Sequence, residues 1–270
     1  MSIREMSVAG SFYPNSSQEI EAMLDHFNTI LEKNVNMHQL LSFESRAVIV
    51  PHAGYIYSGF TANVAYRTLA TKPLKQVVVV GPSHRQLFKG ISIADYTHYA
   101  TPFGMLPVAT QTVETLKQKE GISFLPHVHA EHSTEVQMPF IKYYMPDVSV
   151  VELIYGKEDP HHLSSMIDQL LEESQTAVVI STDLSHFYDI KKAQKHDGIC
   201  LDAITTLDPL RLEQGCEACG KTGVEAIILS ARERGLIPHV LDYRTSADIS
   251  GDTTQVVGYL SALFEERNHA

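Results

Sequence analysis

The sequence is poor in cysteine and has no long apolar segment. Its 270 residues include three cysteines, Cys200, Cys216 and Cys219. So small and odd a number in a chain of this size predicts reduced thiols and a cytoplasmic location. No apolar stretch reaches the roughly 20 residues of a membrane span. The first residues lack the basic segment and apolar core of a signal peptide, so we expect neither insertion into a membrane nor secretion.

The sequence is also short of positive charge. Its 21 Lys and Arg face 32 Asp and Glu, which gives a net charge of −11. Binding to nucleic acid or to anionic lipid needs basic surface, so the composition predicts neither. The P-loop, the dinucleotide-binding G-x-G-x-x-G and the hydrolase elbow G-x-S-x-G are missing from the sequence. The corresponding ATPase, dinucleotide-dependent and hydrolase functions therefore lack support.

What the chain does contain is a regular alternation of apolar runs and amphipathic segments. Four runs rich in β-branched residues are typical of strands buried on both faces: "AVIV" (47–50), "VVVV" (77–80), "VSVVELIYG" (148–156) and the apolar start of "TAVVISTDLSH" (176–186). Helical patterns separate them. Buried strands that alternate with helices predict a single α/β domain over residues 1–270. We expect three layers, with a mostly parallel or mixed central sheet and helices on both faces.

Histidine is abundant, and its positions relative to the apolar runs are informative. Of the 14 histidines, His52 follows the first run, His84 the second and His186 the fourth, where Asp183 precedes it. Ligands of open α/β sheets bind beyond the carboxyl ends of the strands. If these strands are neighbours, the side chains converge in a cleft that suits a divalent transition metal or proton transfer near neutral pH. Each histidine alone could simply cap a loop, but the recurrence favours a shared site.

A second pair of functional groups lies in "EHSTEVQMPF" (131–140). His132 and Glu135 stand three residues apart, and they share one face if residues 132–145 are helical. Pro139 predicts a kink or an early stop in that helix. Such pairs are often solvated decoration, but the apolar neighbours favour partial burial and a place in the cleft.

Taken together, the motifs resemble those of the MEMO family. They are "AGSFYP", "VPHAGYIYSG", "VVVVGPSH", "TPFG", "EHSTEVQMPF", "STDLSHF", "ACG" and "VVGY", and they extend from about Ala9 to Tyr259. Bacterial members are often labelled protein B of the AmmeMemoRadiSam system, which also contains a radical-SAM protein and an AMMECR-like protein. The family's fold is similar to that of class III non-haem iron extradiol dioxygenases. The resemblance therefore implies that fold and a bound metal, iron first, with copper or zinc as alternatives.

The resemblance also assigns the metal ligands. His52 of "PHAGY" and His84 of "GPSH" look like two ligands of the family's metal. Animal members take a third ligand from a cysteine near the C-terminus, whereas residues 244–255 of this chain contain none. The matching position falls at about Ile249, and the adjacent Asp248 could supply a carboxylate. We therefore predict a metal site made of His52, His84 and Asp248.

Catalytic roles follow for the remaining groups of the cleft. Asp183 and His186 resemble groups that line it, and His132 and Glu135 belong to the family's other motif. His186 or His132 would act as acid–base, and Asp183 would orient an imidazole through its second nitrogen.

Three functions remain open at this point. The first is a redox or dioxygenase-like enzyme that acts on an unknown small molecule. The second is a non-catalytic module that uses the same cleft for a small ligand or peptide, or that serves as a partner of the radical-SAM and AMMECR-like proteins. The third, a hydrolase that uses Ser83 or Ser185, lacks the elbow motif. For Cys219, whose "CG" matches the family, we expect a packing or helix-start role.

Overall fold

The computed structural model describes residues 2–267, and the strands within that range form two sheets. The strands of the larger sheet, in spatial order, are β10 (His186–Tyr188), β12 (Val256–Glu265), β2 (Ser45–Val50), β9 (Thr176–Ser181), β3 (Gln76–Pro82), β8 (Ser149–Tyr155), β4 (Ile91–Ile93) and β7 (Ile122–Ser123). A further strand, β11 (Ile237–Thr245), pairs with β12. The smaller sheet consists of β1 (Ile3–Arg4), β5 (His98–Thr101) and β6 (Gly104–Pro107).

The centre of the larger sheet is parallel. Strands β2, β9, β3 and β8 pair side by side in parallel, whereas β12 and β4 are antiparallel to their inner neighbours. The four valines 77–80 are completely buried, as expected for a strand covered on both faces. The four predicted strands and the mixed, mainly parallel sheet are confirmed.

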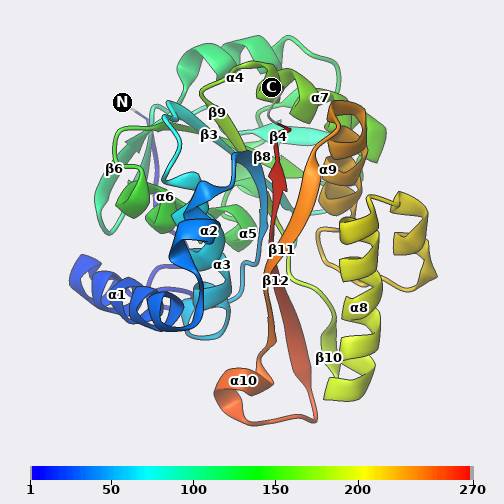
Figure 1. Ribbon diagram of the computed structural model, residues 1–270. Helices are drawn as coiled ribbons and strands as arrows, with labels where there is room; N and C mark the ends of the chain where they lie inside the picture. Colours follow the sequence, from blue (N-terminus) through cyan, green and yellow to red (C-terminus); the bar gives the residue numbers. More distant parts are fainter. Residues whose placement is uncertain (1, 268–270) are drawn as a thin grey trace.

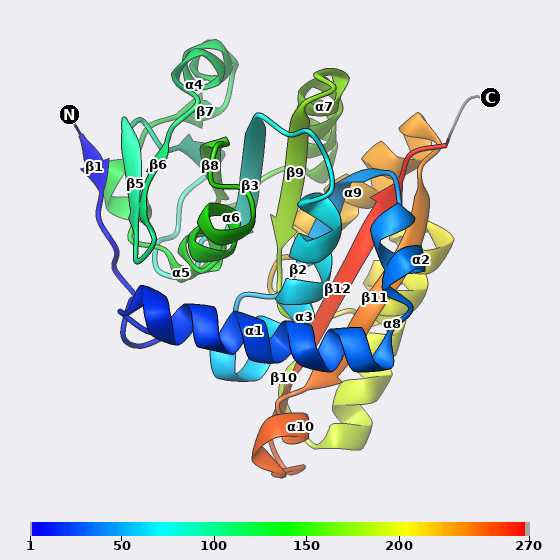
Figure 2. The same ribbon diagram turned by 60° about the vertical axis from the view of Figure 1, so that its left-hand side comes forward.

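Helices cover both faces of this sheet (Figures 1 and 2). In Figure 2, α1 (Ser17–Asn34), α2 (Met37–Ser42) and α3 (Tyr55–Leu69) lie in front of the sheet, with α7 (Pro160–Glu172) and α9 (Lys221–Arg234) behind it. The other helices are α4 (Thr110–Lys117), α5 (His132–Glu135), α6 (Met138–Tyr144), α8 (Ile190–Thr206) and α10 (Ala247–Ser250). The three-layer arrangement is therefore confirmed.

Local sequence signals place the helix ends. Ser16 caps α1 by accepting a hydrogen bond from the backbone of Glu19, and Gly235 ends α9 in the left-handed conformation. The segment 132–145 breaks before Pro139, so α5 ends at Glu135 and α6 begins at Met138. None of the helices within residues 2–267 combines the length and apolar character needed to cross a membrane.

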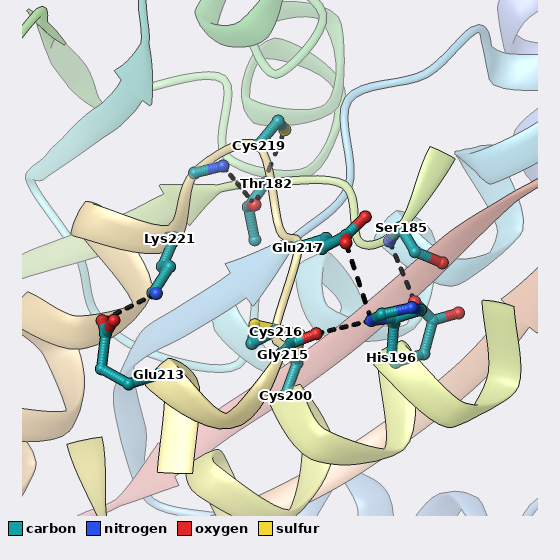
Figure 3. The surroundings of a disulfide bond; sticks show 12 residues. Thr182, Ser185, His196, Cys200, Glu213, Gly215, Cys216, Glu217, Cys219 and Lys221 are labelled. Carbon is teal, nitrogen blue, oxygen red and sulfur yellow. Dashed lines mark hydrogen bonds and ion pairs between the residues drawn. A yellow bond between two sulfur atoms is a disulfide. The ribbon is translucent and has the colours of Figure 1, made fainter. Parts of the chain in front are cut away.

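The expectation of reduced thiols is wrong for two of the three cysteines. Cys200 of α8 forms a disulfide with Cys216, and their Cα atoms are 4.9 Å apart (Figure 3). The sequence separation of 16 residues gave no sign of this pairing, which depends on the turn Pro209–Gln214 folding back on α8. The disulfide removes the argument from reduced thiols on which the cytoplasmic expectation rested.

A polar cluster lies inside the apolar core. His129 places Nδ1 2.5 Å from Glu152 Oε2 and Nε2 2.8 Å from Ser92 Oγ, and the three residues are completely buried. The order serine, histidine, carboxylate resembles a hydrolytic triad, but such burial leaves no room for a substrate. Burial raises the pKa of Glu152 to about 8 and lowers the pKa of His129 to about 3. A neutral histidine beside a protonated carboxyl is the arrangement that a dry core favours.

We predict that the disulfide stabilises the fold by about 3 kcal/mol, because it closes a loop of about 15 residues in the unfolded chain. The double variant Cys200→Ser/Cys216→Ser should unfold at lower urea concentration, and reductant should destabilise the unmodified protein similarly. Cys219→Ser serves as the control and should remain sensitive to reductant. Equal unfolding free energies with and without reductant would contradict the prediction.

We also predict that stability falls as the pH rises from about 6.5 to 8. The folded state keeps a proton on Glu152 that the unfolded state has already lost, so folding becomes less favourable by at most about 1.4 kcal/mol per pH unit. The depressed pKa of His129 acts with the opposite sign, but only below pH 6.5. In Glu152→Gln the decline over this window should be shallower, as measured by urea unfolding at several pH values. Parallel curves for the two proteins would refute the assignment.

Candidate metal centre

Three parallel strands deliver functional groups to one edge of the sheet. His52 follows β2, Asp183 follows β9 and His84 follows β3, and these strands are adjacent in the order β2-β9-β3. Because neighbouring parallel strands end at the same edge, the side chains that follow them lie close together. The condition on which convergence of these side chains depended, that their strands are neighbours, is therefore met.

A short helix brings a third histidine to this edge. Helix α5 begins with His132 and rests on the end of β3, where Ser133 Oγ donates a hydrogen bond to the carbonyl oxygen of Pro82 at 2.7 Å. Gly81 makes this approach possible. A Cβ atom there would stand 2.8 Å from both Ser133 Oγ and Thr134 Cγ2, closer than side chains tolerate.

His52, His84 and His132 form one group. One ring nitrogen from each lies within 4.8 Å of the others, and no further group of three or more His, Cys, Asp or Glu side chains with this property occurs in residues 2–267. The ring centroids are 5.0 Å apart for His52 and His84, 5.3 Å for His52 and His132, and 4.6 Å for His84 and His132. Three imidazoles so close together are suited to hold a divalent transition metal.

Hydrogen bonds fix the ring of His52. Ser181 Oγ donates its proton to the carbonyl oxygen of Ser133 at 2.5 Å. It must therefore accept from His52 Nδ1, which lies 3.0 Å away. Nδ1 of His52 then carries the ring proton, and Nε2 keeps the lone pair that a metal would use.

Glu131 fixes the other two rings. Its Oε1 accepts from Nδ1 of His84 at 3.2 Å and from Nδ1 of His132 at 2.9 Å, and its Oε2 accepts from the backbone N–H of His84 at 2.7 Å. Burial alone would raise the pKa of Glu131, but the hydrogen bonds from His132 and His84 outweigh burial and hold this pKa well below its usual value. A buried carboxylate thus leaves Nε2 as the free nitrogen of both histidines.

The centre is buried on one side and open on the other. His52 is 1% exposed, whereas the side chains of His132 and His84 are 18% and 30% exposed. Burial, followed by the neighbouring charges of His84 and His132, lowers the pKa of His52 well below its ordinary value. His52 is therefore neutral, as a metal ligand must be.

Cys219 is a neighbour of this group that the sequence analysis had given only a packing or helix-start role. Its Sγ lies 3.2 Å from His52 Nε2, and the backbone N–H of Asp183 donates to the same sulfur at 3.2 Å. Burial raises the pKa of Cys219 to about 12, so the sulfur is a thiol here. The "CG" motif was the available signal, but its distance from His52 along the chain hid the contact.

Asp183 and His186 border the group in different ways. Asp183 Oδ1 accepts from the backbone N–H of His52 at 2.7 Å, so this carboxylate fixes the loop rather than an imidazole. Ring orientation, the role we expected of Asp183, falls instead to Ser181 and Glu131. Burial raises the pKa of Asp183 above its ordinary value. His186 is half-buried in β10 and is close enough to His52 and Asp183 to contribute to the pKa of both.

Glu135 and Asp248 lie outside the histidine group. Glu135 pairs with Arg4 at 2.8 Å and accepts from the backbone of Ser7 and Val8, so it anchors the N-terminal segment. Asp248 lies in α10, at the tip of the β11–β12 hairpin (Figure 1). Its Oδ2 accepts from the backbone N–H of Thr245, at the end of β11, at 2.7 Å. The structure therefore brings His132 to the third position that we had expected Asp248 to occupy.

The fold and this centre define an α/β protein with a histidine triad at the carboxyl edge of its sheet. A family model described as Memo-like protein matches residues 4–263, so the chain belongs to the MEMO family, as its motifs predicted. A MEMO1 family protein of Thermotoga neapolitana is 34% identical to it over 282 aligned residues, covering 97% of this chain and 99% of the relative. Relatives with the same description in Methanobrevibacter smithii and Aquifex aeolicus are each 30% identical and are covered over their whole length.

Because Glu131 orients two of the three rings, we predict that Glu131→Gln weakens metal binding by about 10- to 100-fold. The amide keeps the shape of the side chain, but its NH2 group then faces another donor, either the backbone N–H of His84 or the two ring N–H groups. Because two donors repel each other, at least one imidazole is displaced from its position. Competition with a chelator measures the affinity. Glu217→Gln, at the exposed Tyr188 contact, is the matched control. Identical affinities of Glu131→Gln and the control would show that Glu131 does not orient the rings.

Proposed function

We propose that this MEMO-family protein is a metal-dependent redox protein, with iron as its metal, that acts on a small molecule. The observation that carries the proposal is the triad of His52, His84 and His132, whose Nδ1 atoms are all engaged by hydrogen-bond acceptors. Three neutral imidazoles on one side of an ion leave its other side open to ligands.

The chemistry of the donors fits a transition metal. Imidazole nitrogen suits iron, copper and zinc, whereas magnesium and calcium prefer oxygen. His52, His84 and His132 would hold the ion, which when bound would supply redox chemistry with dioxygen. The position of the triad at the edge of a three-layer α/β sheet supports the proposed relation to class III extradiol dioxygenases. The donor set differs from the two-His-one-carboxylate arrangement of non-haem iron oxygenases, because a third imidazole, His132, takes the place of the carboxylate.

Two surface cavities of small-molecule size lie beside residues that contact the triad, although neither is lined by a triad histidine. Phe12 stacks against His132, with ring centroids 4.7 Å apart, and also lines a surface cavity of about 410 Å³. On the other side, Cys219 and Ser83 line a second cavity of about 600 Å³. Both volumes lie in the range of small-molecule pockets. His186 would exchange a proton with the substrate at its imidazole, while Asp183 keeps the His52 loop in place.

The rival functions are less well supported by the geometry. The hydroxyls of Ser83 and Ser185 donate to the backbone carbonyls of Gln86 and Ala193, rather than to a histidine as a serine nucleophile would. An adaptor module would not need three rings with engaged Nδ1 atoms. The radical-SAM and AMMECR-like proteins of the same system remain our proposed partners, as sources or users of the small molecule.

We expect anaerobic reconstitution with Fe(II) to give one metal ion per chain, as measured by elemental analysis of protein without a histidine tag. His84→Ala and His132→Ala should each lose most of this iron, because only two of the three imidazoles then remain to hold the ion. Parallel reconstitutions with copper and zinc rank the metals.

His161→Ala is the matched control, since this exposed histidine at the start of α7 lies outside the triad. It should keep full iron content. Unchanged iron in the His52→Ala/His84→Ala double variant would remove the triad as the metal site, and an iron-free wild type would leave the adaptor function as the better explanation.

A further inference from the structure

We propose that the cavity of about 600 Å³ beside Cys219 binds the phosphate group of a small molecule. Three features carry this inference: two lysines that face each other, the open first turn of helix α9 and a buried tyrosine hydroxyl. That the small molecule is the substrate of the triad rests on the proposed function. The phosphate site itself needs no metal.

Two lysines stand opposite each other at the wall of this cavity. Lys89 and Lys157 both line it, and their backbones form a β-bridge at the start of β4 and the end of β8. The N–H of Lys157 donates to the carbonyl oxygen of Phe88 at 2.8 Å, which fixes this arrangement. Like charges directly opposite each other on paired strands are destabilising. An anion bound between the two ammonium groups removes that cost.

Nearby acidic side chains do not neutralise these lysines. The lysines also border a neighbouring cavity that contains Glu120, Glu158 and Asp159. However, Glu158 pairs with His162 at 3.1 Å, and Asp159 accepts a backbone N–H as the N-cap of α7. In contrast, the cavity beside Cys219 has no Asp or Glu among its described lining residues. It is therefore a positive site on a protein whose net charge is −11.

Other lysines do form ion pairs with acidic side chains. Within residues 2–267 these lysines are Lys72, Lys117 and Lys221. Figure 3 shows that Lys221 pairs with Glu213 on the side of the loop away from Cys219, at a distance of 2.7 Å. The charges that face the cavity are therefore those of the two facing lysines.

The first turn of α9 supplies a backbone donor. Its N-cap residue is Gly220, which has no side chain to accept the free N–H groups of the helix start. Thr222 of this turn lines the cavity, and neither its N–H nor its hydroxyl has a hydrogen-bond partner in the part of the chain that the structure describes. The N–H groups of both neighbouring residues are engaged. Free N–H groups and the helix dipole make such a helix start suited to phosphate.

A buried hydroxyl completes the donor set. Tyr155, at the end of β8, is 4% exposed and lines the cavity. Its oxygen accepts from the N–H of Gly223 at 3.2 Å, whereas its own proton has no acceptor among the described residues. Burial raises the pKa of Tyr155 well above its ordinary value, so the hydroxyl keeps this proton. A buried donor that lacks an acceptor needs a partner, which a phosphate oxygen provides.

The size and charge of the cavity define the ligand. Two ammonium groups match the charge of a phosphate dianion better than that of a single carboxylate. The volume of about 600 Å³ far exceeds that of a phosphate group, so the body of a small molecule fits beside it. Cys219 joins the cavity to the triad, because its Sγ lies 3.2 Å from Nε2 of His52. A phosphate anchored at the lysines would therefore position the rest of the substrate toward the triad.

Inorganic phosphate is the probe that tests the inference. We expect saturable binding to one site of the metal-free, chelator-treated protein, measured by phosphorus NMR line broadening at constant ionic strength. Lys89→Gln/Lys157→Gln should weaken binding by about 100-fold, because each lysine contributes a charge-assisted hydrogen bond worth roughly 10-fold. Both lysines are exposed, so the variant should fold. Acetate should bind more weakly than phosphate, and tighter binding of acetate would overturn the choice of phosphate.

Three further variants make the result specific. Lys195→Gln is the matched control, because it removes the same charge from an exposed lysine of α8 that does not line the cavity. It should keep the wild-type affinity, and Lys89→Arg/Lys157→Arg should keep most of it. Tyr155→Phe should weaken binding by roughly 3- to 10-fold through loss of one hydrogen bond. Circular dichroism checks the fold, and Thr222→Ala replaces Tyr155→Phe if the phenylalanine variant is unfolded.

The outcomes separate this inference from the proposed function. A wild-type protein that binds iron but no phosphate, or phosphate binding that persists in Lys89→Gln/Lys157→Gln, would overturn the phosphate site alone. The same double variant should keep the iron content of the wild type, because its lysines lie outside the triad. A wild-type protein that binds phosphate but no iron would overturn the proposed function and leave the phosphate site in place.

Discussion

The parallel pairing of β2, β9 and β3 is the constraint on which the rest of the site depends. Val50 pairs in register with Ser181, so the end of β2 and the end of β9 lie at the same height. The loop that carries His52 therefore starts beside the serine that orients its ring. Parallel strands that are buried on both faces tolerate little slippage, because a shift of one residue would turn every side chain to the opposite face. The rigidity of the sheet thus passes directly to His52 and His84, which follow its strands.

The segment from Glu131 to Gln137 adapts this sheet edge to the site. Six of its seven side chains are almost completely buried, and each polar one has a defined partner. Glu131 binds two imidazoles, Glu135 holds the N-terminal segment, and Gln137 donates to the carbonyl oxygen of Pro51 at 2.9 Å. Buried polar groups are costly when unpaired, so the complete pairing makes this segment rigid. Rigid support of this kind is what a metal site requires.

The loop before α9 also reaches the site, where Cys219 contacts His52. The disulfide between Cys200 and Cys216 ties one end of this loop to α8, and Gly220 holds the other end against β9. The histidine triad is thus bordered by three separate supports: the sheet edge, the segment with Glu131 and this loop.

The sequence by itself determined the buried strands, the α/β class, the MEMO family and the positions of His52 and His84. These follow from local patterns, because a ligand placed directly after a buried strand lies at the sheet edge whatever the other contacts are. The tertiary structure alone decided that His132 completes the triad, that Glu135 faces Arg4 and that Asp248 caps its own turn. It also decided the disulfide and the contact of Cys219 with His52. Such contacts join segments far apart in the chain, and their geometry depends on how helices and loops pack, which periodicity and spacing do not encode.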